Sequence, residues 1–294
     1  MFGMDKLKGY FAALPTPFNS GDYKIAEKPL GDLVERNIES GLDGLYIGGS
    51  TGEAFLMSVT ERETVFRYVA EVADKRTTLI AQVGDPNPAV CARLAKTAAT
   101  LGFDAISALP PFYYSYNITE ITRHYSWLSG QTDLPFVIYN IPSLSGVKWS
   151  VKELGQLLEL PGIIGVKNTC NDLYAFEQLR RMSPHSILWH GFDETLLSGL
   201  AMGADGGIGS TYNIQATRIQ AIANAHSEGR NDDASNLQAE ANTLIDAMVS
   251  VGVLPALKFM LGLRGIEMGN CRPPFCALRD NQKKMLEEIA DKFV

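Results

Sequence analysis

The sequence predicts an α/β protein, a closed (β/α)8 barrel (TIM barrel) with a C-terminal helical extension. Short apolar runs alternate with amphipathic helical patterns as far as about residue 210. Eight such runs follow one another at intervals of roughly 20–35 residues, which is typical of βαβ units and a parallel sheet. The length of 294 residues suits one barrel of this kind.

Each predicted strand is a short apolar run that ends in polar residues or glycine. The eight runs are residues 10–14, 44–48, 78–83, 105–109, 135–139, 163–167, 186–190 and 206–209. An open doubly wound sheet is the alternative, but no Gly-x-Gly-x-x-Gly follows the first run. The glycines of residues 206–209 come at the end of the series and lack that spacing, so the closed barrel is favoured.

The segments between the strands carry apolar residues at helical spacing. The predicted helices are residues 28–40, 60–73, 88–101, 118–128, 150–160, 172–182 and 194–202. Gly41 and Gly102 are stop signals for the first and third of these. Thr60 and Glu63 have the spacing of a capping box that opens the second.

Beyond residue 210 the sequence is helical. Patterns at residues 217–228, 232–251, 254–260 and 282–294 predict the last outer helix of the barrel and a helical appendage. No linker rich in proline, glycine or serine intervenes. We therefore expect a single domain, residues 1–294, with the barrel at about 8–228 and the appendage at about 229–294.

Composition limits the function classes. The chain is 46% hydrophobic and 20% charged with a net charge of −7, which argues against a nucleic-acid partner. It has no apolar stretch near the ~20 residues that a membrane helix needs, and residues 1–6 lack the apolar core of a signal peptide. The four cysteines are scattered, as free thiols in a reducing compartment would be. We expect a cytoplasmic protein without a membrane partner.

Lys167 is the first candidate catalytic residue. It follows the apolar residues 163–166, where an unpaired ammonium is poorly tolerated. Desolvation disfavours the charged amine, so a lysine held there can act as a nucleophile and form a Schiff base with a carbonyl substrate. The alternative is a lysine that extends from the strand end into solvent.

In a (β/α)8 barrel the reacting groups lie at the C-terminal ends of the strands. After the second strand, residues 48–53 (GGSTGE) bring Ser50 and Thr51 together with backbone N–H groups, which suits a carboxylate or phosphate but also an ordinary turn. Tyr139 ends the fifth strand, where its hydroxyl can relay a proton.

Two acids, Asp193 and Glu194, follow the seventh strand. They can accept hydrogen bonds from substrate hydroxyls, or cap the helix that begins there. No histidine pairs with a nucleophile, and no set of side chains has metal-ligand spacing. What remains is a metal-free, covalent site centred on a lysine.

Five segments resemble the N-acetylneuraminate lyase group of Schiff-base aldolases, whose related branch is dihydrodipicolinate synthase. They are residues 13–18 (ALPTPF), 48–53 (GGSTGE), 139–142 (YNIP), 165–169 (GVKNT) and 207–210 (GIGS). The resemblance covers essentially the whole chain. It implies Lys167 as the Schiff-base lysine and no separate cofactor.

The resemblance also assigns the other site residues. Tyr139 would relay protons, and Ser50 and Thr51 would hold the carboxylate of a bound pyruvyl group. Tyr113, in the aromatic loop 110–116, would approach the active site of a neighbouring subunit, which implies a homotetramer.

Two positions separate the branches. Synthases usually have Thr-Thr in the segment that corresponds to residues 48–53, where this chain has Ser50-Thr51. They also have an arginine two residues after Asn-x-Pro, where this chain has Leu144. An apolar leucine cannot bind a carboxylate. The lyase branch matches residues 191–194, where the Gly191 carbonyl, Asp193 and Glu194 would bind a polyhydroxyl tail. Thr169 and Ser210 would complete that shell.

The implied reaction is cleavage of N-acetylneuraminate to N-acetylmannosamine and pyruvate, all small molecules. An aldolase for another 2-keto-3-deoxy sugar acid is a second interpretation, since the same acids can bind a shorter polyol. Dihydrodipicolinate synthase activity is a third, and Leu144 opposes it. A non-catalytic sensor of pyruvate or sialic acid is the fourth, although a sensor does not need both Lys167 and Tyr139.

Overall fold

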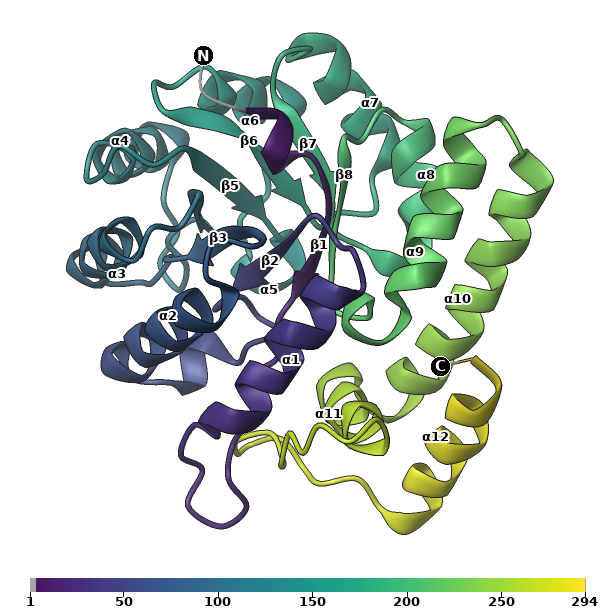
Figure 1. Ribbon diagram of the computed structural model, residues 1–294. Helices are drawn as coiled ribbons and strands as arrows, with labels where there is room; N and C mark the ends of the chain where they lie inside the picture. Colours follow the sequence, from purple (N-terminus) through teal and green to yellow (C-terminus); the bar gives the residue numbers. More distant parts are fainter. Residues whose placement is uncertain (1–3, 294) are drawn as a thin grey trace.

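The structure, a computed structural model, describes residues 4–293 and confirms the predicted barrel. Within these residues eight parallel strands pair in sequence order and close on themselves, β8 with β1 (Figure 1). They are β1 (Gly9–Ala13), β2 (Gly44–Ile47), β3 (Thr78–Gln82), β4 (Ala105–Ala108), β5 (Phe136–Asn140), β6 (Ile163–Asn168), β7 (Ile187–His190) and β8 (Gly206–Gly209). Each overlaps its predicted apolar run.

Helices surround the strands. They are α1 (Glu27–Glu39), α2 (Val59–Ala73), α3 (Pro88–Thr100), α4 (Ile118–Ser129), α5 (Pro142–Ser145), α6 (Val151–Leu158), α7 (Leu173–Met182), α8 (Leu196–Ala201) and α9 (Tyr212–Ser227). Short 3-10 turns lie at η1 (Met4–Leu7), η2 (Ala54–Leu56) and η3 (Asp193–Thr195). Helix α5 and these turns were not among the predicted elements.

The apolar core has two layers, because strand side chains alternate between the barrel interior and the surrounding helices. In β1, Phe11 and Ala13 belong to the inner cluster, whereas Ala12 packs outward. Trp189 of β7 fills the interior beside Phe11, with ring centroids 6.3 Å apart and nearly perpendicular planes. The barrel interior is therefore a packed core and not a pore.

The capping box of α2 lies two residues before the predicted position. Ser58, not Thr60, is the N-cap: its hydroxyl accepts from the Glu61 N–H at 3.3 Å, and its own N–H donates to Glu61 Oε2 at 2.7 Å. The predicted partner, Glu63, instead accepts a 2.8 Å hydrogen bond from Arg93 of α3. The pattern was ambiguous because Ser58–Glu61 and Thr60–Glu63 have the same spacing.

The C-terminal helices α10 (Asn231–Val251), α11 (Val253–Leu263) and α12 (Asp280–Phe293) lie together on one side of the barrel (Figure 1). Helix α10 packs along α9, and α11 and α12 pack on α10. None of the described helices alone is long and apolar enough to cross a bilayer. The pair α10–α11 passes that test by length and composition, but it is bent by 117°.

Candidate active site

Lys167 lies at the C-terminal end of β6, in register with Tyr139 of β5. The side chain is buried, with 4% of its surface exposed. Its Nζ lies 4.2 Å from the ring centroids of both Tyr139 and Tyr46. The aliphatic stem is thus held inside the barrel, in contrast to the alternative in which it extends into solvent.

Tyr46 of β2 is a site residue that the sequence analysis missed. Its ring meets that of Tyr139 edge to face, with centroids 5.9 Å apart, and its hydroxyl donates to Ser107 Oγ at 3.0 Å. Burial, reinforced by the nearby Tyr139, raises the pKa of Tyr46 well above its usual value. The phenol therefore stays neutral and supplies an aromatic face to Lys167.

A cavity of about 330 Å³ opens above Lys167 and Tyr139. Most of the predicted site residues line it, namely Thr51, Thr169, Gly191, Asp193, Glu194 and Ser210. Ser50 lines an adjoining apolar cavity of about 260 Å³, and the two cavities share Ile141 and Leu144 as walls. Tyr113 lines neither of them and is 87% exposed.

Asp193 is a buried carboxylate held by the start of α9. Its Oδ2 accepts two hydrogen bonds from Thr211, from the backbone N–H at 2.7 Å and from the hydroxyl at 2.6 Å. Burial raises the pKa of Asp193 to about 6, although the Thr211 hydrogen bonds act in the opposite direction. Because its side chain bonds to Thr211 and not to the helix behind it, the helix-cap alternative fails for Asp193.

Two glycines beside the cavity stand at positions where any side chain would collide with a site residue. A Cβ on Gly209 would come within 2.1 Å of Asp193 Oδ1, and one on Gly191 within 2.0 Å of Thr169 Oγ1. Thr169 Oγ1 is itself buried and makes no hydrogen bond with any residue in the described part of the chain. An unpaired buried hydroxyl beside a cavity is suited to bind a polar ligand atom.

The GGSTGE segment, residues 48–53 (the cradle loop), is held by α11 and by the loop that follows it. Glu53, which ends the GGSTGE segment, has a left-handed backbone (φ 56°) and is 4% exposed. Its carboxylate forms a 2.5 Å ion pair with Lys258 of α11 and accepts the backbone N–H of Arg272 at 2.8 Å. Neither Glu53 nor Lys258 was among the predicted site residues.

The same helices form part of the cavity wall. Ile245 and Val249 of α10 and Val253 of α11 line the cavity together with the polar residues that follow β6 and β7. The appendage therefore closes one side of the site. Leu144, at the position where synthases carry an arginine, is 67% exposed and also lines the cavity.

Between residues 4 and 293 we found no cluster of three or more histidine, cysteine, aspartate or glutamate side chains placed to hold a metal ion. The buried His190 lies behind the site: its Nε2 is 2.8 Å from Thr195 Oγ1, and burial lowers its pKa to about 4. It is therefore neutral near pH 7.

Comparison with known proteins gives a match to the Dihydrodipicolinate synthetase family over residues 6–293. The N-acetylneuraminate lyase of Enterobacter sp. (strain 638) is 45% identical over 291 residues, which cover 98% of each chain. A similar protein of the same name from Escherichia coli (strain SMS-3-5 / SECEC) is 44% identical over 290 residues, 98% of this chain and 97% of that one.

Solved structures resemble the chain over the same extent. CdNal from Clostridium difficile, in complex with mannosamine, has a TM-score of 0.96 at 37% identity and covers 98% of this chain and 99% of its own. N-acetylneuraminate lyase from Fusobacterium nucleatum, complexed with pyruvate, has a TM-score of 0.93 at 38% identity, with 98% of both chains covered.

Proposed function

The chain belongs to the dihydrodipicolinate synthetase family, and from that premise we propose that it is a class I aldolase that cleaves N-acetylneuraminate to N-acetylmannosamine and pyruvate. The observation that carries the proposal is Lys167, buried between Tyr46 and Tyr139 with its Nζ 4.2 Å from each ring centroid, in the wall of a cavity that Asp193 and Glu194 also line. Leu144 stands where a synthase would have a carboxylate-binding arginine.

Lys167 is the nucleophile. Its amine adds to the C2 ketone of the open-chain sugar acid and expels water, giving a protonated imine. The imine nitrogen then accepts the electron pair of the breaking C3–C4 bond, and N-acetylmannosamine leaves. Because the lysine itself supplies the electron sink, this step draws on no separate cofactor.

Tyr139 moves the proton. Assisted by the substrate carboxylate, its hydroxyl takes the proton from the C4 hydroxyl and later returns one to C3 of the enamine. Water then hydrolyses the imine, which releases pyruvate and frees Lys167. The hydroxyls and backbone N–H groups of Ser50 and Thr51 hold the pyruvyl carboxylate in the loop that Glu53 and Lys258 fix.

The residues that directly follow β6, β7 and β8 set specificity. The Gly191 carbonyl, Asp193 and Glu194 accept hydrogen bonds from the hydroxyls of the sugar tail. Thr169 and Ser210 complete that shell, and the unpaired Thr169 Oγ1 supports this role. Such a site rejects substrates that leave its buried polar groups unpaired.

We also propose a single-domain chain, in which barrel and appendage share the site, working as a homotetramer in the cytoplasm. In that assembly Tyr113 would approach the active site of a neighbouring subunit, and its exposure in an aromatic loop, with a left-handed backbone (φ 84°), supports this. The free cysteines suit a reducing compartment.

The test of the lysine is reductive trapping. Borohydride added with pyruvate should leave a stable adduct on Lys167, located by peptide mass spectrometry. The Lys167→Ala variant is the control and should carry none. An adduct on another lysine would contradict the assignment.

The test of the substrate is pyruvate release from N-acetylneuraminate measured beside 2-keto-3-deoxygluconate. We expect a clear preference for N-acetylneuraminate. Preference for the shorter acid would make the protein an aldolase of another sugar acid, and binding without turnover of either would make it a sensor.

A further inference from the structure

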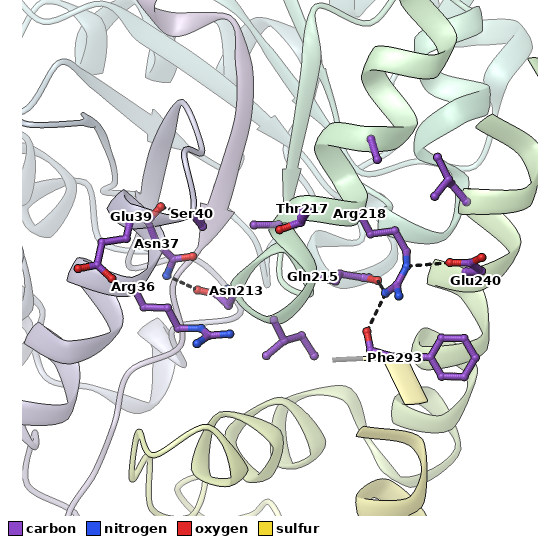
Figure 2. A pocket seen from close by; sticks show the side chains of 14 residues that line it. Arg36, Asn37, Glu39, Ser40, Asn213, Gln215, Thr217, Arg218, Glu240 and Phe293 are labelled. Carbon is purple, nitrogen blue, oxygen red and sulfur yellow. Dashed lines mark hydrogen bonds and ion pairs between the residues drawn. The ribbon is translucent and has the colours of Figure 1, made fainter. Parts of the chain in front are cut away.

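A chain of hydrogen bonds links the proposed polyol-binding carboxylate to a cleft on the outside of the barrel. The cleft, of about 550 Å³, lies among α1, α9, α10 and the end of α12. Figure 2 shows Gln215 and Arg218 of α9 turned toward one another there, beside Glu240 and Phe293. Gln215 is itself buried and, through Thr211, reaches the active-site side of the barrel wall.

The direction of every bond in this chain is fixed by chemistry. Arg218 can only donate, and its Nη1 donates to Gln215 Oε1 at 3.3 Å. The amide nitrogen of Gln215 must therefore face the other way, where it donates to Thr211 Oγ1 at 2.7 Å. The single hydroxyl hydrogen of Thr211 is then directed to Asp193 Oδ2, 2.6 Å away.

Arg218 is anchored in turn. Its Nη1 also donates to the Phe293 carbonyl at 3.0 Å, and its Nε lies 3.5 Å from Glu240 Oε2 (Figure 2). The backbone of α9 departs from helical geometry at Gln215 (φ −136°, ψ 32°), one turn after Thr211. The kink lies where the side chain of Gln215 reaches back to Thr211.

We propose, on the basis of the function proposed above, that Gln215 is a positioning residue that determines specificity for the polyhydroxyl tail of the substrate. By holding the Thr211 hydroxyl as a donor, it saturates Asp193 Oδ2 and leaves Oδ1 to accept from a sugar hydroxyl. Gln215 acts on tail recognition and not on imine formation, because Lys167 and Tyr139 lie outside the chain of bonds.

The decisive variant is Gln215→Glu, which keeps the shape and reverses the bonding. Beside Arg218 the new carboxylate stays ionised and can only accept, so it competes with Asp193 for the Thr211 hydrogen. We expect kcat/KM for N-acetylneuraminate to fall about 10- to 100-fold, the size of a lost hydrogen bond to a charged group. Borohydride trapping of pyruvate should change by less than about twofold, since the chain of bonds does not reach Lys167.

Two further variants separate the loss of the Gln215 donor from the effect of an added charge. Gln215→Met removes the donor without adding charge and should lower the same kcat/KM roughly threefold to tenfold. Gln220→Glu makes the same chemical change on α9, at a side chain that bonds only the Gly41 carbonyl among the described residues. Its kcat/KM should remain normal.

Equal losses of cleavage and of pyruvate trapping in the Gln215 variants would reduce Gln215 to a structural residue. Normal cleavage in both variants would overturn the inference as well. If the unmodified protein traps pyruvate but does not cleave N-acetylneuraminate, the proposed substrate is wrong and the inference falls with it. The unmodified protein therefore distinguishes the two failures.

Discussion

Tyr139 and Lys167 are paired in register on neighbouring strands, and the lysine Nζ lies 4.2 Å from the centre of the tyrosine ring. Parallel pairing fixes the two Cα atoms, so the relative position of amine and phenol is set by the sheet itself and not by a loop. Groups placed by strands hold their geometry more closely than groups on loops.

Replacing Tyr139 by Phe should preserve this packing and remove only the proton relay. We expect kcat for N-acetylneuraminate cleavage to fall by roughly 10²–10⁴, while pyruvate still forms a trappable imine on Lys167. Steady-state pyruvate release measures kcat, and borohydride trapping measures imine formation. Near-normal turnover would remove Tyr139 from the mechanism.

The ionised, buried carboxylate of Asp193 should lower the free energy of unfolding, although the proposed substrate recognition needs it. Its pKa is raised from 3.8 to about 6 in the folded protein. Between these values the folded chain holds a proton that the unfolded chain has released, so stability falls as the pH rises through this window. Asp193→Asn should therefore raise the free energy of unfolding at pH 8 by up to about 3 kcal/mol, and cleavage should be impaired.

Urea unfolding at a series of pH values measures this effect. The gain should shrink as the pH falls from about 6 to about 4, because Asp193 itself becomes protonated in the folded state. An Asp193→Asn variant that is less stable than the unmodified protein at pH 8 would contradict the assignment.

The barrel could be predicted, and Lys167 and Tyr139 could be identified as candidates, because their signals are local. A lysine that directly follows a run of four apolar or glycine residues, as Lys167 does, is visible in the sequence, and so is Tyr139 at the end of the preceding strand. Tyr46, like Tyr139, belongs to the inner cluster of the barrel, but in the sequence it stands inside the apolar run of β2. There it cannot be distinguished from an ordinary core tyrosine.

Contacts between distant segments could not be predicted. Lys258 looks like a surface residue of a C-terminal helix until the fold places it beside Glu53. Helix α9 starts five residues before the predicted position, because residues 212–216 are all buried and the helix is kinked at Gln215, so no helical periodicity marks this turn. Ser50 and Thr51 are adjacent in sequence, yet they line different cavities.

The glycine before Ser210 should be indispensable for the specificity site. In Gly209→Ala the new Cβ would come within 2.1 Å of Asp193 Oδ1, so the carboxylate must move. We expect a loss of about 1–3 kcal/mol in stability and at least about tenfold in kcat/KM for N-acetylneuraminate.

Gly130→Ala is the matched control, because its Cβ would meet no atom closer than 3.6 Å and its φ is −80°. Thermal unfolding and pyruvate release compare the two variants. A Gly209→Ala protein as active as the Gly130→Ala protein would show that Asp193 does not need its present position.

The buried Glu53–Lys258 pair should stabilise the fold only as a pair. Both side chains are almost fully buried, so Lys258→Met leaves the Glu53 carboxylate without its counter-ion, and we expect a loss of about 3–5 kcal/mol. Adding Glu53→Gln removes the unpaired charge and should recover part of that loss.

The matched control is Lys28→Met, which breaks an exposed pair with Asp32 and should change stability little. Urea unfolding of all the variants gives the comparison. A double variant no more stable than Lys258→Met alone would mean that Glu53 stabilises the cradle loop through its Arg272 hydrogen bond and not through the ion pair.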